Sequence, residues 1–170
     1  MGASGCGKTT LLSCVIGSMT LNAGSIKVKG CSGLKILEHE IGYMPQQTAL
    51  IDEFTIEECI YYFGRIYGLT DKKIESRFQF LKKLLDLPVA SRYISNCSGG
   101  QQRRVSFAVA ILHEPELLIL DEPTVGLDPI LRSEIWDFLI KSTRTSNLAV
   151  IITTHYIEEA NEANCVSTIP

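Results

Sequence analysis

The stretch GASGCGKT, residues 2–9, constrains the fold of this chain more than any other feature. It matches the pattern G-x-x-x-x-G-K-[ST], in which glycines let backbone N–H groups curl around phosphate oxygens. The apolar segment LLSCVIGSM follows, and the positive end of a helix at this place favours negative charge. A glycine-rich turn with a surface lysine is the alternative interpretation. The helix in the expected place favours a phosphate-binding loop.

The residue types in this loop have distinct expected roles toward a bound nucleotide. Lys8 provides a point charge for the β- and γ-phosphates, and the Thr9 hydroxyl is a ligand for Mg²⁺. The other loop positions predicted to contact the phosphates are Gly2, Ser4, Gly5, Gly7 and Thr10.

Turn residues and apolar patterns predict strands that alternate with helices. Strands are expected within residues 24–30 and 40–46, and as buried apolar runs at Leu117–Leu120 and Val150–Thr153. Apolar residues at helical spacing predict helices at Thr55–Tyr67 and Asp71–Leu87, the second capped by Thr70 or Asp71 and stopped by Pro88. A further helix is expected over residues 128–141, with Asp128 as its cap and proline at its first position.

This alternation predicts an α/β fold of the P-loop NTPase type, with a mainly parallel sheet and flanking helices. The length fits one domain, residues 1–170. Two adjacent helices without a strand between them predict a small helical subdomain, inserted over about residues 52–105.

Two polar sites follow the predicted buried strands. Asp121, at the carboxyl end of LLILD, is placed to hold Mg²⁺ through water, and Glu122 is placed to polarise an attacking water. His155 follows the next strand, on the same edge of the sheet as Asp121 and the phosphate loop. Ligands of such sheets bind outside the carboxyl ends of the strands, which favours a functional role over a polar turn or a structural histidine.

The segment NCSGGQQRR predicts a second helix start that binds an anion. Ser98 and Gln101 fit the capping box, so a helix begins at Ser98. Gly99 and Gly100 leave the N–H groups of that positive helix end uncovered. A capping box alone would be structural. Two phosphate-binding helix starts in one domain instead suggest a second copy of the domain, packed head to tail.

Composition argues against several classes of function. The net charge of −3 gives no global attraction for nucleic acid, and no nucleic-acid partner is expected. No apolar run approaches the roughly 20 residues that span a bilayer. The six cysteines are scattered and form no CxxC pair, which predicts free thiols in a reducing compartment rather than a metal site.

Together these motifs resemble the nucleotide-binding domain of ATP-binding-cassette (ABC) transporters, and the resemblance covers essentially the whole chain. Residues 2–9 resemble its Walker A motif, Leu117–Asp121 its Walker B motif, and residues 98–101 its signature motif. Gln46 matches the Q-loop glutamine, and Asp128 the D-loop aspartate. Several longer stretches look closest to the G- or H-type exporters of arthropods.

The resemblance implies a mechanism. Two domains close on two ATP molecules, each held between the Walker motifs of one copy and the signature of the other. Thr9, Gln46 and Asp121 would surround Mg²⁺. Glu122 would act as the catalytic base, with Gln46 and His155 as further catalytic residues. The bound phosphates would contact Lys8 and, across the dimer, Ser98, Gly99, Gly100 and Gln101, with Asp128 nearby.

The resemblance also implies a membrane partner. Closing and reopening would drive membrane helices, so the domain would work at the cytosolic face of a membrane, with the transmembrane domain expected on the same full-length chain. The loop of residues 47–55 and the helix after it are the expected contact. The apolar stripe of that helix has a simpler interpretation as core.

This chain departs from the family pattern in two ways. Cys97 replaces the leucine that usually precedes the signature serine, and a small apolar residue there is expected to have a modest effect. The strand that leads into the phosphate loop and the strands that usually follow His155 are missing, so the fold is expected to be incomplete at both ends, with poor stability and weak ATP binding in isolation.

Three other interpretations remain. A small kinase or GTPase would lack the signature motif. A soluble, non-transport ABC ATPase acting on ribosomes or DNA would usually carry two such domains. A truncated, non-catalytic ABC fragment would bind a partner domain without turning over ATP.

Overall fold

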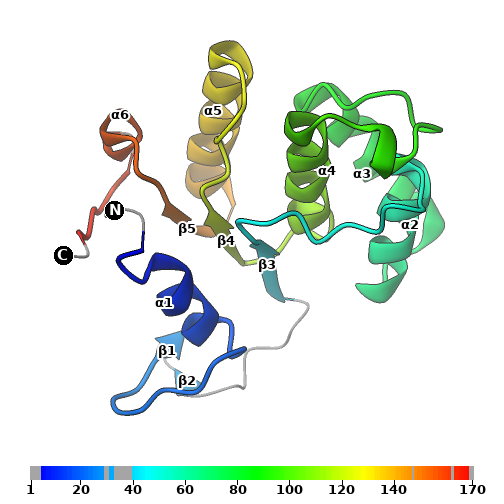
Figure 1. Ribbon diagram of the computed structural model, residues 1–170. Coiled ribbons are helices and arrows are strands. Elements are labelled where there is room, and N and C mark those ends of the chain that lie inside the picture. Colours follow the sequence, from blue (N-terminus) through cyan, green and yellow to red (C-terminus); the bar gives the residue numbers. More distant parts are fainter. Residues whose placement is uncertain (1–4, 29–30, 33–39, 147, 162, 169–170) are drawn as a thin grey trace.

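The computed structural model describes residues 5–28, 31–32, 40–146, 148–161 and 163–168. Three strands follow the first helix, three α-helices follow those strands, and strands and helices alternate in the rest of the described chain (Figure 1). The helices are α1 (Lys8–Val15), α2 (Ile56–Ile66), α3 (Asp71–Leu84), α4 (Gly99–Ile111), α5 (Pro129–Thr145) and α6 (Ile157–Ala160). The strands are β1 (Lys27–Val28), β2 (Cys31–Ser32), β3 (Ile41–Met44), β4 (Leu117–Asp121) and β5 (Ala149–Thr153).

The main sheet has the order β3-β4-β5, and both pairings are parallel. Leu117 lies opposite Ile41 on one side and Ala149 on the other, so the strand ends of β3, β4 and β5 are in register. β1 and β2 form a separate antiparallel pair. The predicted α/β fold with a mainly parallel sheet is therefore confirmed, and both predicted strands form. β4 is buried as predicted, but β5 is not, since among its residues only Thr153 is buried.

The two faces of β4 divide the core. Leu117 and Ile119 pack with Leu12 of α1 on one face. Leu118 and Leu120 belong to the larger cluster on the other face, to which α2–α5 contribute. Successive side chains of a strand point to opposite faces, so this alternation follows from the period of the strand itself. Helices therefore cover both faces of the sheet (Figure 1).

The helices α2 and α3 begin at side-chain caps. Thr55 forms a capping box with Glu58, and the Thr70 hydroxyl accepts a hydrogen bond from the backbone of Lys73. Thr70, rather than Asp71, is thus the cap of α3. This helix ends at Leu84 and not at Leu87 as predicted, because Asp86 adopts a left-handed backbone with a φ of 43° before Pro88 is reached.

The apolar stripe of α2 is core, as its simpler interpretation predicted. Ile56 and Ile60 are fully buried, and Phe63 packs against the larger cluster. The exposed side of α2 carries different residues. It borders a groove of about 750 Å³, lined by Phe54, Glu57, Glu58, Tyr61, Tyr62, Arg65 and Ile66.

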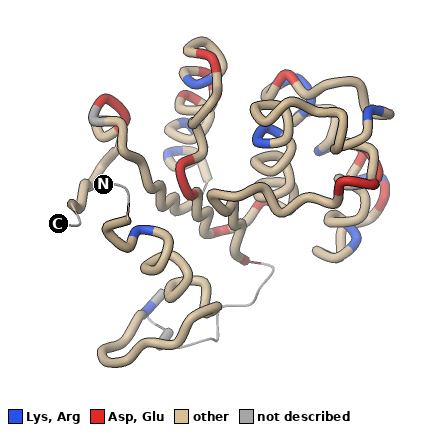
Figure 2. Tube along the Cα trace, in the orientation of Figure 1, with Lys and Arg blue, Asp and Glu red and all other residues tan. Residues whose placement is uncertain are grey.

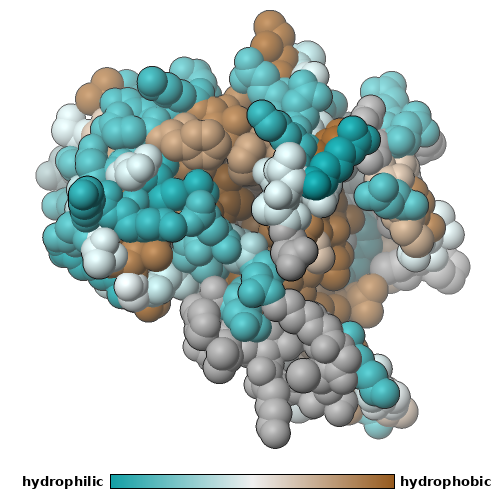
Figure 3. Space-filling view, turned by 180° about the vertical axis from the view of Figure 1, so that it is seen from behind, coloured by the Kyte–Doolittle hydropathy of each residue, from teal (hydrophilic) through white to brown (hydrophobic). Residues whose placement is uncertain are grey.

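The β5 side of the sheet exposes apolar residues. A cavity of about 600 Å³ lies between α1, α5, β5 and residues 163–167. Ile151 of β5 is 38% exposed. Seen from behind, apolar residues are visible in the hollow middle of the molecule, between polar outer surfaces (Figure 3).

Free thiols, as predicted, are found at Cys6, Cys14, Cys59, Cys97 and Cys165. Burial raises the pKa of Cys59 to about 12. This thiol therefore stays protonated at neutral pH and behaves as a small apolar core residue.

Basic and acidic residues are interspersed along α5 (Figure 2).

One glycine sets the distance between α4 and the sheet. A Cβ added at Gly42 of β3 would lie 2.1 Å from the backbone oxygen of Ala110 and 2.8 Å from the Cγ of Pro115. The first atom belongs to the backbone of α4 and has little freedom to move. Only glycine therefore allows this helix to approach the strand so closely.

We predict that Gly42→Ala lowers the free energy of unfolding by about 3 kcal/mol, the upper end of the range for overpacked cores. The clash outweighs the roughly 0.5–1 kcal/mol that a Cβ contributes through lower entropy of the unfolded chain. Pulse proteolysis in urea measures the change. Gly99→Ala is the control, because its Cβ would meet nothing within 4 Å. Equal stability of Gly42→Ala and the wild type would contradict the prediction.

Candidate functional site

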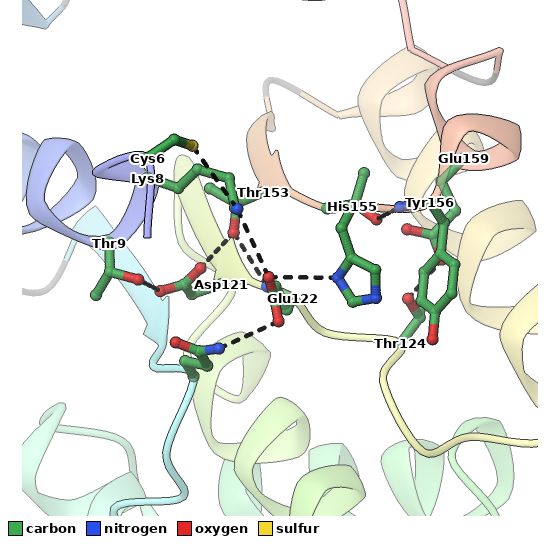
Figure 4. A network of polar contacts seen from close by, with 12 residues as sticks. Cys6, Lys8, Thr9, Asp121, Glu122, Thr124, Thr153, His155, Tyr156 and Glu159 are labelled. Carbon is green, nitrogen blue, oxygen red and sulfur yellow. Dashed lines mark hydrogen bonds and ion pairs between the residues drawn. The ribbon is translucent and has the colours of Figure 1, made fainter. Parts of the chain in front are cut away.

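The carboxylate of Glu122 is the point at which three predicted motifs meet (Figure 4). Its Oε1 lies 3.9 Å from the Lys8 Nζ and 3.4 Å from the His155 Nδ1. Its Oε2 accepts a hydrogen bond of 3.2 Å from the Gln46 Nε2. The side chains of Lys8 and Glu122 are only 6% and 13% exposed, so their attraction is weakly screened by solvent. The predicted catalytic residues Glu122, Gln46 and His155 are thus brought together.

A second group of oxygens lies beside this carboxylate. The Thr9 hydroxyl donates to the Asp121 Oδ2 at 2.6 Å. The Thr153 hydroxyl donates to the other oxygen, Oδ1, of the same carboxylate. Asp121 is 1% exposed, and these bonds satisfy a carboxylate whose burial would otherwise be costly. The end of β4 is therefore connected to the start of α1 and to the end of β5.

The phosphate-loop residues that the structure describes form an open helix start. Gly5 and Gly7 have φ values of 82° and 93°, in the left-handed region that glycine adopts without strain. Gly7 caps α1 without a side-chain hydrogen bond, and the first turn of the helix contains no acidic residue. The first N–H groups of α1 are thus left for an anion. Thr10 is exposed on this turn, and the predicted Gly2 and Ser4 lie outside the described residues.

The donor set beside Glu122 fits a magnesium ion. Thr9, Gln46 and Asp121 offer a hydroxyl, an amide and a carboxylate oxygen, and Mg²⁺ prefers such hard oxygen ligands and keeps several waters. Among the described residues, no group of three or more His, Cys, Asp or Glu side chains is arranged for a metal. The mixed set with few protein ligands is what a phosphate-bound Mg²⁺ needs.

A tilted aromatic contact lies beside His155. The Tyr156 ring lies 4.2 Å from the imidazole, centroid to centroid, and the Arg132 guanidinium lies 4.9 Å from the Tyr156 ring. Arg132 belongs to α5, so this helix supports the histidine through one aromatic side chain. The sequence predicts no role for Arg132 or Tyr156. The only signal is that Tyr156 directly follows His155, a predicted site residue.

The backbone of Glu122 is held as firmly as its side chain. Its φ is 53°, a left-handed conformation that is unfavourable for a residue with a Cβ. Its N–H bonds to the Thr153 carbonyl at 3.0 Å and to the Thr153 hydroxyl at 3.1 Å. Its carbonyl accepts from Arg103 of α4. Sequence reasoning missed Thr153 and Arg103, although both lie inside segments that it singled out.

The residues of NCSGGQ form a helix start at a separate place. The Ser98–Gln101 capping box is present, and Ser98 and Gly99 are exposed. The helix α4 packs with the larger core cluster, while α1 covers the other face of the sheet. Figure 1 shows the two helices on opposite sides of β3 and β4. The two predicted anion-binding helix starts are therefore not joined in one chain.

Three further residues of this region were singled out in the sequence. Cys97 is buried, and the modest effect expected of it in place of leucine stays a prediction. A Cβ on Gly100 would lie 3.1 Å from the Gly126 carbonyl, so this glycine also has a packing reason. Asp128 caps α5 by accepting the Leu131 N–H at 3.0 Å. Its contact with nucleotide stays a prediction.

Known proteins resemble this chain over most of its length. Residues 1–125 match the family described as ABC transporter. The chain is 42% identical over 168 residues to ABC transporter G family member 23 of Dictyostelium discoideum, covering 96% of this chain and 24% of that protein. It is 43% identical over 169 residues to G family member 20 of the same organism, covering 94% and 22%. The chain thus spans about a quarter of the length of these relatives.

A solved structure has the same architecture. A dimeric bacterial ABC transporter cassette superposes with a TM-score of 0.90 at 25% identity, covering 99% of this chain and 78% of that one. No helix in the described part of the chain is both long and apolar enough to cross a membrane.

These findings confirm the predicted resemblance and agree with its placement near the G family of transporters, while the export direction and the H-type and arthropod assignments stay predictions. They exclude the small kinase or GTPase. The chain belongs to the ABC transporter family, and its residues form the nucleotide-binding fold of that family.

Proposed function

We propose that this chain binds ATP together with Mg²⁺ and hydrolyses the ATP, as the nucleotide-binding domain of a transporter that exports a substrate across a membrane. The observation that carries the proposal is the convergence of Lys8, Gln46 and His155 on the Glu122 carboxylate. Four segments far apart in the sequence supply these groups. The names of the transporter relatives support the coupling to transport.

The binding step follows from charge and open N–H groups. The N–H groups at the start of α1 and the Lys8 ammonium would hold the β- and γ-phosphates. Lys8 would then exchange its contact with Glu122 for the phosphate oxygens, which frees the carboxylate. Thr9, Asp121 and Gln46 would hold Mg²⁺, which neutralises charge on the phosphate oxygens when it is bound.

The hydrolytic step needs a water in line with the γ-phosphorus and a base that takes a proton from this water. Glu122 would take a proton from a water molecule as the oxygen of that water attacks the γ-phosphorus. The bond from this phosphorus to the β–γ bridging oxygen would then break. ADP and inorganic phosphate are the products. Gln46 would orient the Glu122 carboxylate, and His155 would donate a hydrogen bond to the γ-phosphate. Most of the catalysis would be positioning and charge stabilisation.

A second nucleotide-binding domain would complete the site. The start of α4 is exposed and separated from α1, so its uncovered N–H groups suit a phosphate held by another copy. In a head-to-tail pair, Ser98, Gly99, Gly100 and Gln101 of one chain would face the Walker residues of the other, with Asp128 nearby. The dimeric cassette with the same fold supports this arrangement.

A membrane domain would contact the chain at α2. We propose that residues 52–105 act as a helical subdomain, and that residues 47–55 and the exposed side of α2 form the contact at the cytosolic face. The groove beside Phe54, Tyr62 and Ile66 supports this, since it combines apolar side chains with charged ones.

We predict that Glu122→Gln lowers the rate of ATP hydrolysis at least ~100-fold, because a neutral amide does not accept the proton of the water as a carboxylate does. ATP affinity should change little. Phosphate release by the native polypeptide that carries these residues measures the rate. Glu134→Gln is the control, since it removes the same charge from an exposed position on α5. Equal rates for the wild type and Glu122→Gln would contradict catalysis by this site and favour the non-catalytic alternative.

We predict that mixing two inactive variants restores hydrolysis if the site is shared between chains. Gly99→Asp adds a negative charge at the start of α4, where its Cβ would meet nothing in its own chain. Lys8→Ala removes the phosphate-binding cation. Random pairing of the two variants leaves one intact site in half of the dimers, so about a quarter of wild-type activity is expected.

Gly99→Ala is the control for this complementation, because it adds only a methyl group, which would meet nothing within 4 Å in its own chain, and no charge. It should retain most of the wild-type rate. A mixture as inactive as its components would contradict the shared site and indicate that each chain hydrolyses ATP by itself.

We predict that the exposed side of α2 is covered in the assembled transporter. Tyr62 and Phe80 are each 43% exposed in this chain, so cysteines at the two positions form a matched pair. Maleimide should label Tyr62→Cys at least ~10-fold more slowly than Phe80→Cys, since a buried interface excludes the reagent. Peptide mass spectrometry of the native polypeptide measures both rates, and equal labelling would contradict the contact.

A further inference from the structure

Arg103 of α4 points into the site rather than toward solvent, and it is 9% exposed. Its Nη1 donates to the Gln46 carbonyl at 2.8 Å. Its Nη2 donates to the Asp121 carbonyl at 2.9 Å and to the Glu122 carbonyl. One guanidinium thus joins the loop after β3 to the loop after β4.

These bonds are the polar anchors of the Arg103 side chain. Its Nε makes no hydrogen bond among the described residues, so both terminal nitrogens hold the guanidinium through carbonyls of the site. Burial lowers the pKa of this guanidinium, and the charges of Glu122 and Asp121 raise it. It stays ionised at any ordinary pH, and hydrogen bonds from an ionised donor are the strong ones.

The carbonyl that Arg103 holds belongs to a strained residue. The left-handed backbone of Glu122 is fixed at its N–H by Thr153 and at its carbonyl by Arg103. The orientation of these two peptide groups sets the direction of the Glu122 side chain. Arg103 also fixes the backbone of Gln46, whose amide donates to that same carboxylate.

We infer that Arg103 is a positioning residue for hydrolysis, which holds the Gln46 and Glu122 backbones in one arrangement and connects that arrangement to the start of α4. This inference rests on the proposed function. Arg103 lies five residues after the Ser98 cap, on the helix whose exposed start would engage a partner-bound phosphate. A shift of α4 on closure would therefore reach the backbones of Gln46 and Glu122 directly through hydrogen bonds.

The neighbouring Arg104 provides a matched control. Its Nη1 donates to the carbonyls of Leu85 and Asp86 at 3.3 and 2.7 Å, and to the Asp86 carboxylate at 2.9 Å. Arg104 thus ties α4 to the end of α3. It is the same residue type on the same helix, and its bonds are of the same kind.

The experiment compares Arg103→Gln, Arg103→Lys and Arg104→Gln in the native polypeptide, measuring kcat and KM for ATP hydrolysis. Arg103→Gln should lower kcat ~10–100-fold and leave KM within ~3-fold, because misplaced catalytic groups reduce turnover more than substrate binding. Arg103→Lys should recover part of kcat, since an ammonium donates to carbonyls without the planar fork. Arg104→Gln should keep kcat within ~3-fold of the wild type.

Thermal unfolding of each variant separates positioning from loss of fold. If Arg103→Gln does not fold, Arg103→Lys decides: a lower kcat with unchanged KM supports positioning, and a wild-type kcat overturns it. Equal kcat values for Arg103→Gln and Arg104→Gln overturn the inference and leave the proposed function standing. Equal rates for the wild type and Glu122→Gln overturn both.

Discussion

The buried strand β4 is the constraint on which the rest of the structure depends. All five of its residues are buried, and alternate side chains enter the two core clusters on opposite faces of the sheet. Its pairing with β3 and β5 sets one register, and a shift by one residue would exchange the two sets of side chains between the faces. That register fixes where the strand ends, and so it places Asp121 and Glu122 at the edge of the sheet.

A pair of carboxylates at the end of a buried strand needs partners. Asp121 obtains hydroxyls from Thr9 and Thr153, which belong to α1 and β5. Glu122 obtains Lys8, Gln46 and His155. The polar contacts that satisfy these charges are thus also the contacts that join the motifs. This explains why residues from both ends of the described chain share one small site.

The left-handed backbone of Glu122 adds a second requirement. Residues with a Cβ occupy this conformation only when their surroundings determine it. Thr153 fixes this conformation at the N–H of Glu122, and Arg103 fixes it at the carbonyl. Under the proposed function, the strained residue is the base for hydrolysis, and its geometry depends on the helix that would meet the partner domain. Catalysis and assembly would then share one helix.

The sequence by itself determined the local parts of this protein. The predicted caps Ser98 and Asp128 each begin a helix, and Thr70 is one of the two caps predicted for α3, because a cap depends on neighbours three residues away. The apolar runs predicted β4 and β5, and the polar residues after them predicted the candidate site. The predicted end of α3 was wrong, because the spacing of apolar residues does not reveal the left-handed backbone of Asp86.

Only the tertiary structure decided which distant groups meet. The bonds of Arg103 reach residues 57 and 18 positions away, and a run of two arginines after a capping box does not reveal which of them points inward. The same holds for Gly42, whose lack of a side chain matters only because the backbone of α4 lies against it. Long-range contacts depend on how strands and helices pack, and that packing is a property of the whole chain rather than of any short segment.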